Sequence, residues 1–143
     1  IFSDSPYLMA WNGGVAAFFS QPIFGIGPDA YRLLCPDLAI NFENIRCHPQ
    51  PHNYYIQIAG EMGALGLVSA VVMFGAIVKK AFSARQTIAP NCFALSAFIS
   101  PVVFFFPLQT TNDFFGQFTN VFVWSALGLV LAASELSSNA KST

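Results

Sequence analysis

Residues 62–78 read MGALGLVSAVVMFGAIV, an apolar stretch without a charged side chain. A helix that crosses a bilayer needs about 20 mostly apolar residues, and about 17 at the low end. This stretch meets the lower limit, so its composition predicts a transmembrane helix. For any single stretch of this kind, the alternative is a core helix of a soluble protein.

Two further stretches of the same kind follow, at residues 92–108 and 117–133. The whole chain is 55% hydrophobic and only 9% charged, whereas a soluble domain carries about 25% charged residues. Three apolar stretches in succession predict an all-α integral membrane protein with about three transmembrane helices. Six basic residues give no basic face, which argues against a nucleic-acid partner.

Basic residues predict the orientation of these helices. Lys79, Lys80 and Arg85 follow the first stretch, and Lys141 follows the third. Positively charged loops stay in the cytoplasm. We therefore expect residues 1–61 and the short link 109–117 to lie outside, residues 62–134 to contain the helices, and residues 135–143 to form a cytoplasmic tail.

The external segment 1–61 looks structured. Large apolar residues mark one face of a helix near its start: Leu8, Trp11, Val15, Phe18 and Phe19. Such a face lies on a membrane or packs on other helices. Next comes QPIFGIGPDAYRLLC (residues 21–35), which predicts a turn leading into a short helix.

Cys35 and Cys47 lie within the external segment, where an oxidising compartment would allow a disulfide between them. Cys92 opens the second apolar stretch and is expected to be a free, small hydrophobic residue. The alternative is a metal site that includes Cys47, His48 and His52. No second Cys/His pair completes four ligands, so no metal and no cofactor are expected.

Residues 48–53 read HPQPHN and lead into the first apolar stretch. The two prolines predict a stiff, extended approach, and Asn53 is a favoured N-cap residue. A helix that begins there would merge with the first span. Gly60, Gly63 and Gly66 lie roughly on one face of it and would let another helix approach closely.

His52 would lie at the positive end of this helix dipole, which disfavours imidazolium. A neutral imidazole can accept a proton from a hydroxyl group and act as a general base. The plainer alternative is a loop histidine that only caps or hydrogen-bonds. Glu61, Asn112 and Asp113 are weaker polar candidates near the same place, with solvated, turn or capping roles as their alternatives.

Three elements together resemble the family of bacterial O-antigen ligases. His52-Asn53, followed by nine residues and Gly63, resembles the family's His-Asn pair before a transmembrane helix. PIFGIGPDAYR (residues 22–32) is similar to its Pro-hydrophobic-hydrophobic-Gly-x-Gly stretch. NDFFGQFTNVFVWSALGLVLA (residues 112–132) is similar to its last helix. The resemblance covers nearly all of the chain and implies that the chain is the C-terminal part of a longer protein with more helices.

The resemblance implies a metal-independent, inverting glycosyltransferase of the C structural class in the bacterial inner membrane, with residues 1–61 in the periplasm. A ligase moves a glycan from undecaprenyl diphosphate to lipid A–core. An O-antigen or exopolysaccharide polymerase passes it to another lipid-linked glycan, and a protein O-oligosaccharyltransferase passes it to a protein. In each case the histidine that matches His52 would activate the acceptor hydroxyl.

The resemblance also implies that arginines hold the donor diphosphate, because a guanidinium group binds phosphate oxygens in pairs. The family often has an arginine where Tyr7 stands here, and Tyr7 is expected to contact the substrate through one donated hydrogen bond but without a charge. Arg32 is then the best local phosphate partner and Arg46 the second. Asn53 and Gln57, one helical turn apart, complete the expected substrate-binding residues.

Two other classes of function remain open at this point. A polysaccharide transporter or flippase would place its site at a broken helix near the membrane midplane, with Pro101 and Pro107 as the break. A partner-binding membrane subunit would use the glycine face that includes Gly63. The polar cluster around His52 lies outside the predicted spans, which favours the enzyme.

Overall fold

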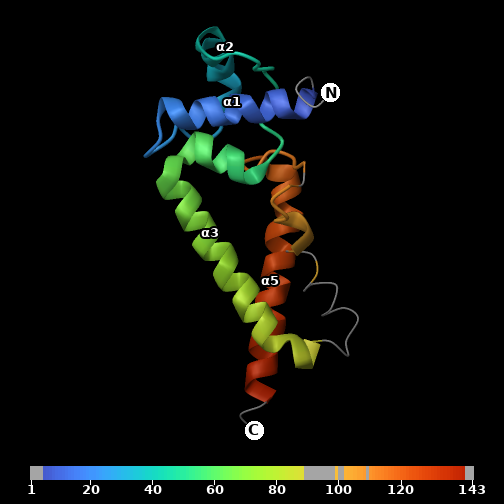
Figure 1. Cartoon of the computed structure of the whole chain (residues 1–143). Helices are drawn as coiled ribbons and strands as arrows, with labels where there is room; N and C mark the ends of the chain where they lie inside the picture. Colours follow the sequence, from blue (N-terminus) through green and yellow to red (C-terminus); the bar gives the residue numbers. More distant parts are fainter. Residues whose placement is uncertain (1–4, 89–98, 100–101, 109, 141–143) are drawn as a thin grey trace. The chain divides into compact units, whose positions relative to one another are not determined.

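The computed structural model describes residues 5–88, 99, 102–108 and 110–140 (Figure 1). All regular structure in these residues is helical, with no β-strand among them. The chain forms two compact units, which are Ile1–Ala70 with Pro107–Gly116, and Val71–Phe106 with Gln117–Thr143. The first unit therefore extends past the boundary expected at residues 61/62 and takes in most of the outer link.

Helix α1 (Pro6–Ser20) begins with a proline in its first turn, where the missing amide proton costs nothing. Its buried residues are all small: Ala10, Gly13, Gly14, Ala16 and Ala17. The large apolar face expected from the sequence is only partly covered: Val15 is 41% and Phe19 67% exposed, whereas Leu8, Trp11 and Phe18 are half-buried. The closest packing of α1 therefore uses its small residues, and two large apolar residues, Val15 and Phe19, stay exposed within the described residues.

Small residues let α1 approach the start of helix α3 (Tyr54–Ile88) at backbone distance. A Cβ atom on Gly60 would lie 2.9 Å from the carbonyl oxygen of Gly14, and one on Gly14 would collide with Ile56. Gly60 thus has the expected role of admitting another helix. Gly66 does not, since a Cβ there would meet the side chain of Met62 in its own helix.

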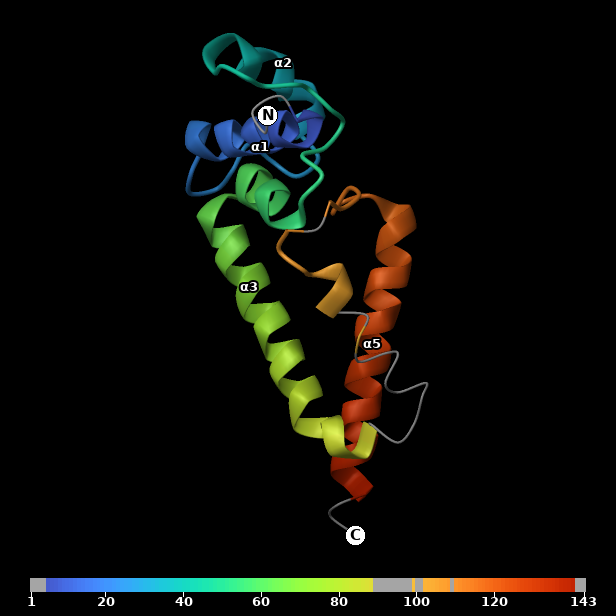
Figure 2. The same ribbon diagram turned by 45° about the vertical axis from the view of Figure 1, so that its right-hand side comes forward.

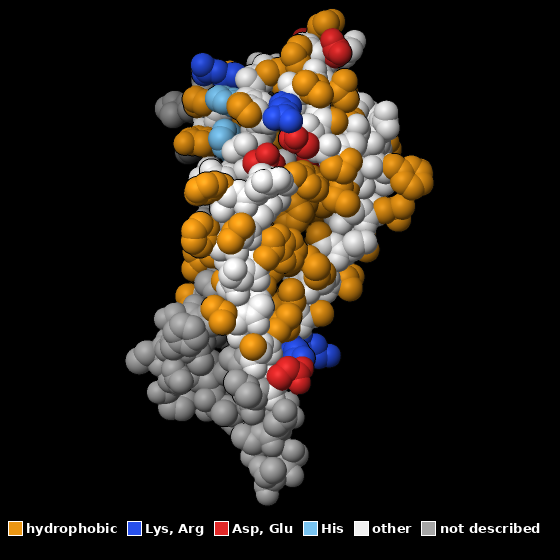
Figure 3. All heavy atoms as spheres, turned by 180° about the vertical axis from the view of Figure 1, so that it is seen from behind, with side chains coloured by type: hydrophobic (Ala, Val, Ile, Leu, Met, Phe, Trp, Pro, Cys, Tyr) orange, Lys and Arg blue, Asp and Glu red, His pale blue; other side chains and the backbone are white. Residues whose placement is uncertain are grey.

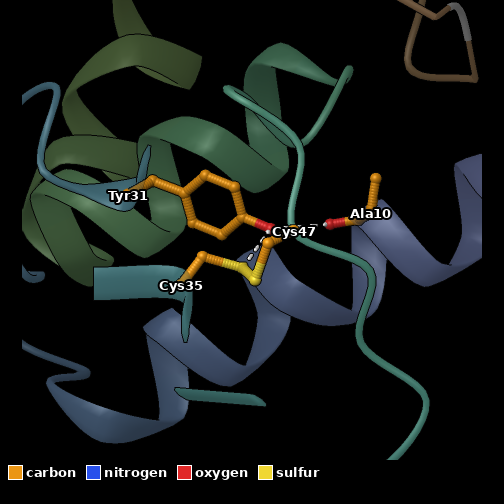
Figure 4. The surroundings of a disulfide bond; sticks show 4 residues. All are labelled: Ala10, Tyr31, Cys35 and Cys47. Carbon is orange, nitrogen blue, oxygen red and sulfur yellow. Dashed lines mark hydrogen bonds between the residues drawn. A yellow bond between two sulfur atoms is a disulfide. The ribbon is translucent and has the colours of Figure 1, made fainter. Parts of the chain in front are cut away.

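Helix α2 (Tyr31–Asn41) is tied to the chain that follows it by a disulfide between Cys35 and Cys47 (Figure 4). Their Cα atoms are 5.6 Å apart. The hydroxyl of the buried Tyr31 lies beside this bond: it donates to the carbonyl of Ala10 in α1 at 3.5 Å and lies 3.4 Å from Cys35 Sγ. This cluster joins α1, α2 and the segment that leads to His52.

Helix α3 is broken at Gly63, where φ is 68° and ψ is −167°. This backbone conformation is essentially restricted to glycine. An unbroken helix bonds each amide to the carbonyl four residues back, so the break separates amides from carbonyls on its two sides. The sequence predicts that Gly63 lies on a helix face that contacts another helix. Instead, it interrupts α3.

The loop Pro22–Gly27 takes up the separated groups. Its amides donate to two carbonyls before the break, and its carbonyls accept from two amides after it. The bonds run from Ile26 N to Gly60 O (3.0 Å), Gly27 N to Glu61 O (2.9 Å), Ala64 N to Pro22 O (2.8 Å) and Leu65 N to Ile23 O (3.4 Å). The loop thus provides hydrogen-bond partners for backbone groups in both halves of α3.

The second unit contains the later part of α3 and helix α5 (Gln117–Ala140), which approach each other near their C-terminal ends (Figures 1 and 2). Lys80 forms an ion pair with Glu135 there, and Phe74 stacks on Phe105 at 3.8 Å between ring centroids. Because α3 continues to Ile88, the predicted basic loop after residue 78 is helical instead.

One helix among the described residues, Tyr54–Lys80, is long and apolar enough to cross a bilayer, and Asn120–Ala132 is a shorter apolar helix. Most of the stretch 92–108, expected to be the second span, lies outside the described residues. Of its described residues, 99 and 102–104 are helical, and turns follow within 105–108. Hydrophobic side chains cover much of the surface of the long helices (Figure 3).

Candidate functional site

His52 adopts a left-handed backbone conformation, with φ of 58°. Left-handed conformations are uncommon outside glycine, although histidine is among the residues that adopt them more often. Such a residue costs of order 1–3 kcal/mol and persists only when its surroundings hold it. Here the neighbouring Pro51 and Asn53 are buried, and the carbonyl of His52 accepts a hydrogen bond from the amide of Thr111 at 2.8 Å.

The half-buried ring of His52 lies among other rings. Its centroid is 5.9 Å from that of Tyr7 in α1 and 5.4 Å from that of His48, both in edge-to-face arrangements. No hydrogen bond to a ring nitrogen of His52 is present within the described part of the chain. An imidazole with free nitrogens and a fixed backbone is able to exchange a proton with a bound hydroxyl group.

Three buried polar atoms of the first unit lack a hydrogen-bond partner within the described residues: Trp11 Nε1, His48 Nε2 and Thr111 Oγ1. A buried polar group without a partner costs about 1–3 kcal/mol. Native structures contain few such groups, and each one calls for an explanation. Two of the three belong to residues that contact His52, His48 through its ring and Thr111 through its amide.

Asn53 caps helix α3. Its Oδ1 accepts from the amides of Tyr55 (3.0 Å) and Ile56 (3.2 Å), which is the N-cap role expected from the sequence. Its Nδ2 donates to the carbonyl of Pro107 at 2.7 Å. Because the side chain is 3% exposed and uses both polar atoms within the fold, a direct substrate contact from Asn53 has no support in this geometry.

Gln57 lies one turn later on the same buried face. Its Oε1 accepts from the amide of Phe114 at 2.8 Å, and its Nε2 donates to Asp113 Oδ1 at 2.6 Å. Asp113 also accepts from the amide of Phe115 at 3.0 Å, as expected for a turn residue. Gln57 therefore anchors the link 110–116 to α3, and substrate binding by its side chain has no support either.

Glu61 continues this face by another turn and is 2% exposed. Its carboxylate accepts from the amides of Asp29 and Tyr31, both at 3.0 Å, at the beginning of α2. A carboxylate there satisfies amides that have no partner within the helix and meets the positive end of its dipole. Asn53, Gln57 and Glu61 form what we call the polar column, a structural spine of the first unit.

The two candidate arginines differ in their surroundings. Arg32 forms an exposed ion pair with Asp29 at 2.6 Å, three residues before it. Arg46 is exposed and belongs to the segment that leads to His48 and His52, and its amide donates to the carbonyl of Met9 at 3.4 Å. The structure thus brings Tyr7 and His52 together, and it places Arg32 on a different element.

Sequence reasoning overlooked Trp11, His48 and Thr111 as site residues. The sequence pattern places Trp11 on an apolar face and indicates His48 only as a metal ligand. Cys47 is now bonded to Cys35, so it has no thiolate to offer such a site. Thr111 carried no sequence signal, because it meets His52 only through the fold of the chain.

Comparisons with protein-family models, with curated proteins and with solved structures give no match to this chain.

Proposed function

We propose that the chain is part of a membrane glycosyltransferase similar to O-antigen ligases, with His52 as the general base. The observation that carries the proposal is the ring of His52, held by its backbone at the start of α3 with no hydrogen bond to its nitrogens from the described residues. The resemblance of the His-Asn pair, the loop Pro22–Gly27 and residues 112–132 to that family supplies the reaction.

In the proposed reaction, a ring nitrogen of His52 accepts the proton of an acceptor hydroxyl on lipid A–core. The hydroxyl oxygen forms a bond to the anomeric carbon of the donor glycan. The bond between that carbon and the phosphate oxygen breaks, and undecaprenyl diphosphate leaves with the bonding electrons. General-base assistance of this kind contributes about 10²–10⁴ to the rate.

Arg46 is the better of the two local partners for the leaving diphosphate. It lies in the same segment as His48 and His52, and it is exposed. Arg32 would first have to leave Asp29, although an exposed ion pair of this kind is worth only about 0–1 kcal/mol. The expected preference for Arg32 is therefore reversed within this proposal.

Exposed apolar side chains on α3 support a membrane location. Only 28% of its most apolar window is buried, and Leu65, Val68 and Val72 are 55%, 61% and 66% exposed. A soluble core helix buries such residues, since each contributes roughly 1.5–3 kcal/mol when removed from water. A helix surrounded by lipid leaves them on its outer surface.

The break at Gly63 does not favour a transporter. Broken helices in transporters direct free backbone groups at a substrate or an ion. In this chain the loop Pro22–Gly27 already occupies groups on both sides of the break. The break expected for a transporter at Pro101 and Pro107 is a different one, and Pro101 lies outside the described residues. The glycosyltransferase remains the proposal.

A His52→Asn substitution tests it, because asparagine removes the imidazole and still tolerates a left-handed backbone. In the host cell we expect at least about a 10²-fold loss of glycan transfer, with lipid-linked glycan accumulating. Asn44→Ala is a matched control, since Asn44 is also left-handed (φ 56°) but exposed. Unchanged transfer in a stably inserted His52→Asn protein would refute the assignment.

The glycolipid pattern also distinguishes the related reactions. Loss of a ligase leaves lipid A–core without the transferred glycan, and full-length glycan accumulates on undecaprenyl diphosphate. Loss of a polymerase leaves single repeats on lipid A–core. Loss of a protein oligosaccharyltransferase changes glycoproteins and leaves lipid A–core unaltered.

A further inference from the structure

The unpartnered atoms around His52 come from three separate parts of the first unit. Trp11 is in α1, His48 is in the extended segment before α3, and Thr111 is in the link 110–116. Atoms from three elements that are all buried and all without a partner in the described chain do not result from one local turn. They indicate that the fold places these polar groups to bind a ligand.

Two of these residues contact His52 directly, and the third lies one helical turn from another residue that does. Thr111 donates its amide to the carbonyl of His52, and the His48 ring lies against the His52 ring. Trp11 lies one helical turn after Tyr7, on the same side of α1, and the Tyr7 ring also contacts His52. Two of the three residues with unpartnered atoms therefore adjoin the proposed base, and Trp11 neighbours Tyr7, which also adjoins it.

The segment that carries His48 also runs alongside α1. Asn12 Nδ2 donates to the carbonyl of Asn44 at 3.3 Å, and the Arg46 amide donates to the carbonyl of Met9. Moving toward higher numbers in the segment thus means moving toward lower numbers in α1. This antiparallel course leads from Arg46 toward the Tyr7 end of the helix, where His48 and His52 are found.

The chemistry of the group is neutral and mixed. An indole N–H is a donor only, a threonine hydroxyl is both donor and acceptor, and an imidazole nitrogen is one or the other. Tyr7 and Trp11 add aromatic surface, which packs on C–H groups. No carboxylate, ammonium or guanidinium is among the unpartnered atoms. A ring that combines hydroxyl groups with apolar faces matches this set, whereas a phosphate would require charge.

We propose that Tyr7, Trp11, His48 and Thr111 form a binding site for a neutral, hydroxyl-rich sugar ring next to His52. Its assignment as the acceptor sugar rests on the proposed glycosyltransferase function. The indole N–H of Trp11 and the hydroxyl of Thr111 hold ring hydroxyls, and the aromatic rings pack on the sugar face. One acceptor hydroxyl then lies against His52.

Fluorine NMR of the protein labelled with fluorotryptophan tests the site in detergent. The Trp11 resonance is assigned by its loss in Trp11→Phe, and Trp124 in α5 provides an internal reference. The probes are the methyl glycosides of glucose, galactose and mannose, with glycerol as a control for nonspecific polyol effects. We expect at least one glycoside to shift the Trp11 resonance saturably, while glycerol and the Trp124 resonance show no such change.

Thr111→Val then removes one unpartnered hydroxyl while keeping the shape of the side chain. We expect it to weaken the binding of the same glycoside by about tenfold, and Thr111→Ser to restore it. Ser69→Ala removes an exposed hydroxyl and should leave binding unchanged. If no glycoside shifts the Trp11 resonance, or if Thr111→Val binds as well as the unaltered protein, buried water satisfies these atoms and the inference is wrong.

The His52→Asn protein separates this inference from the proposed function. A retained Trp11 shift together with retained glycan transfer leaves the sugar site standing and removes His52 as the base. Lost transfer with no Trp11 shift in either protein supports the base and overturns the sugar site.

Discussion

Gly25 and Gly63 lie backbone against backbone. A Cβ atom on Gly25 would collide with the main chain of Glu61 and Met62, and one on Gly63 would collide with that of Ile23. Both glycines have positive φ, 72° and 68°. The contact joins two motifs that are far apart in the sequence, the loop Pro22–Gly27 and the end of the His-Asn-x9-Gly element.

Gly63→Ala is expected to destabilise the first unit. The left-handed backbone alone costs alanine of order 1–3 kcal/mol, and the collision with Ile23 adds to this. Gly75→Ala is the matched control, because a Cβ there meets nothing within 4 Å and alanine favours a helix by about 1 kcal/mol. Thermal unfolding in detergent measures both, and equal stability of the two variants would contradict the described break.

Glu61→Gln is expected to loosen the start of α2. A glutamine side chain has one acceptor oxygen for the amides of Asp29 and Tyr31, and its NH₂ group would face the other amide. Loss of a hydrogen bond to a charged group costs about 1.5–3 kcal/mol. Hydrogen exchange at these amides should accelerate, whereas Glu43→Gln, at an exposed position, should leave them unchanged.

Asn53 substitutions separate its two roles. Asn53→Asp keeps an acceptor for the amides at the start of α3 but cannot donate to Pro107, whereas Asn53→Ala removes both bonds. Loss of an N-cap costs about 0.5–2 kcal/mol, so alanine should be the less stable variant by that amount. If the two variants unfold at the same temperature, the capping bonds contribute no measurable stability.

Cys47→Ser is expected to lower the free energy of unfolding by about 3 kcal/mol, because the Cys35–Cys47 bond closes a short loop. A reducing agent should lower the stability of the unaltered protein to the level of the variant and have no further effect on the variant. Sensitivity of Cys47→Ser to the same reagent would point to a different bond.

The raised pKa of Tyr31 predicts that the folded protein loses stability at alkaline pH. Burial, with the charge of Glu61 as a smaller cause, raises the pKa of Tyr31 from 10.0 to about 12. The folded state therefore holds this proton more tightly than the unfolded state. Its contribution to stability is complete below pH 10.0 and declines as pH rises toward about 12. The tyrosinate absorbance step near that pH should disappear in Tyr31→Phe, and a Tyr31 titrating at 10.0 would contradict its burial.

Local rules were enough to identify several of these features. An asparagine after two prolines caps a helix through its own neighbouring amides, so the start of α3 could be read from residues 51–56. The turn followed by a short helix around residues 21–35 is likewise a matter of nearby residues. The cysteine pair followed from two residues in one external segment.

Non-local contacts decide what the sequence analysis missed. The role of Gly63 depends on a loop almost 40 residues earlier, and Thr111 meets His52 only after the chain has returned from the second unit. The polar column is an intermediate case. Asn53, Gln57 and Glu61 recur at a spacing of four, which places them on one helix face, but only the fold shows that the face is turned inward.

The break in α3 gives a mechanical meaning to the nine residues between Asn53 and Gly63. Each helical residue turns the chain by about 100°. The number of residues in this segment therefore fixes the rotation of Gly63 about the helix axis relative to Asn53. One end is held by the Asn53 cap beside His52, and the other is held by the contact of Gly63 with the loop Pro22–Gly27. Adding or removing one residue would rotate one end of the segment relative to the other. The cap at Asn53 and the contact at Gly63 could then not form together, and the polar column would be turned away from its hydrogen-bond partners. Individual side chains on the outer face of the segment are free to change, whereas its length is not.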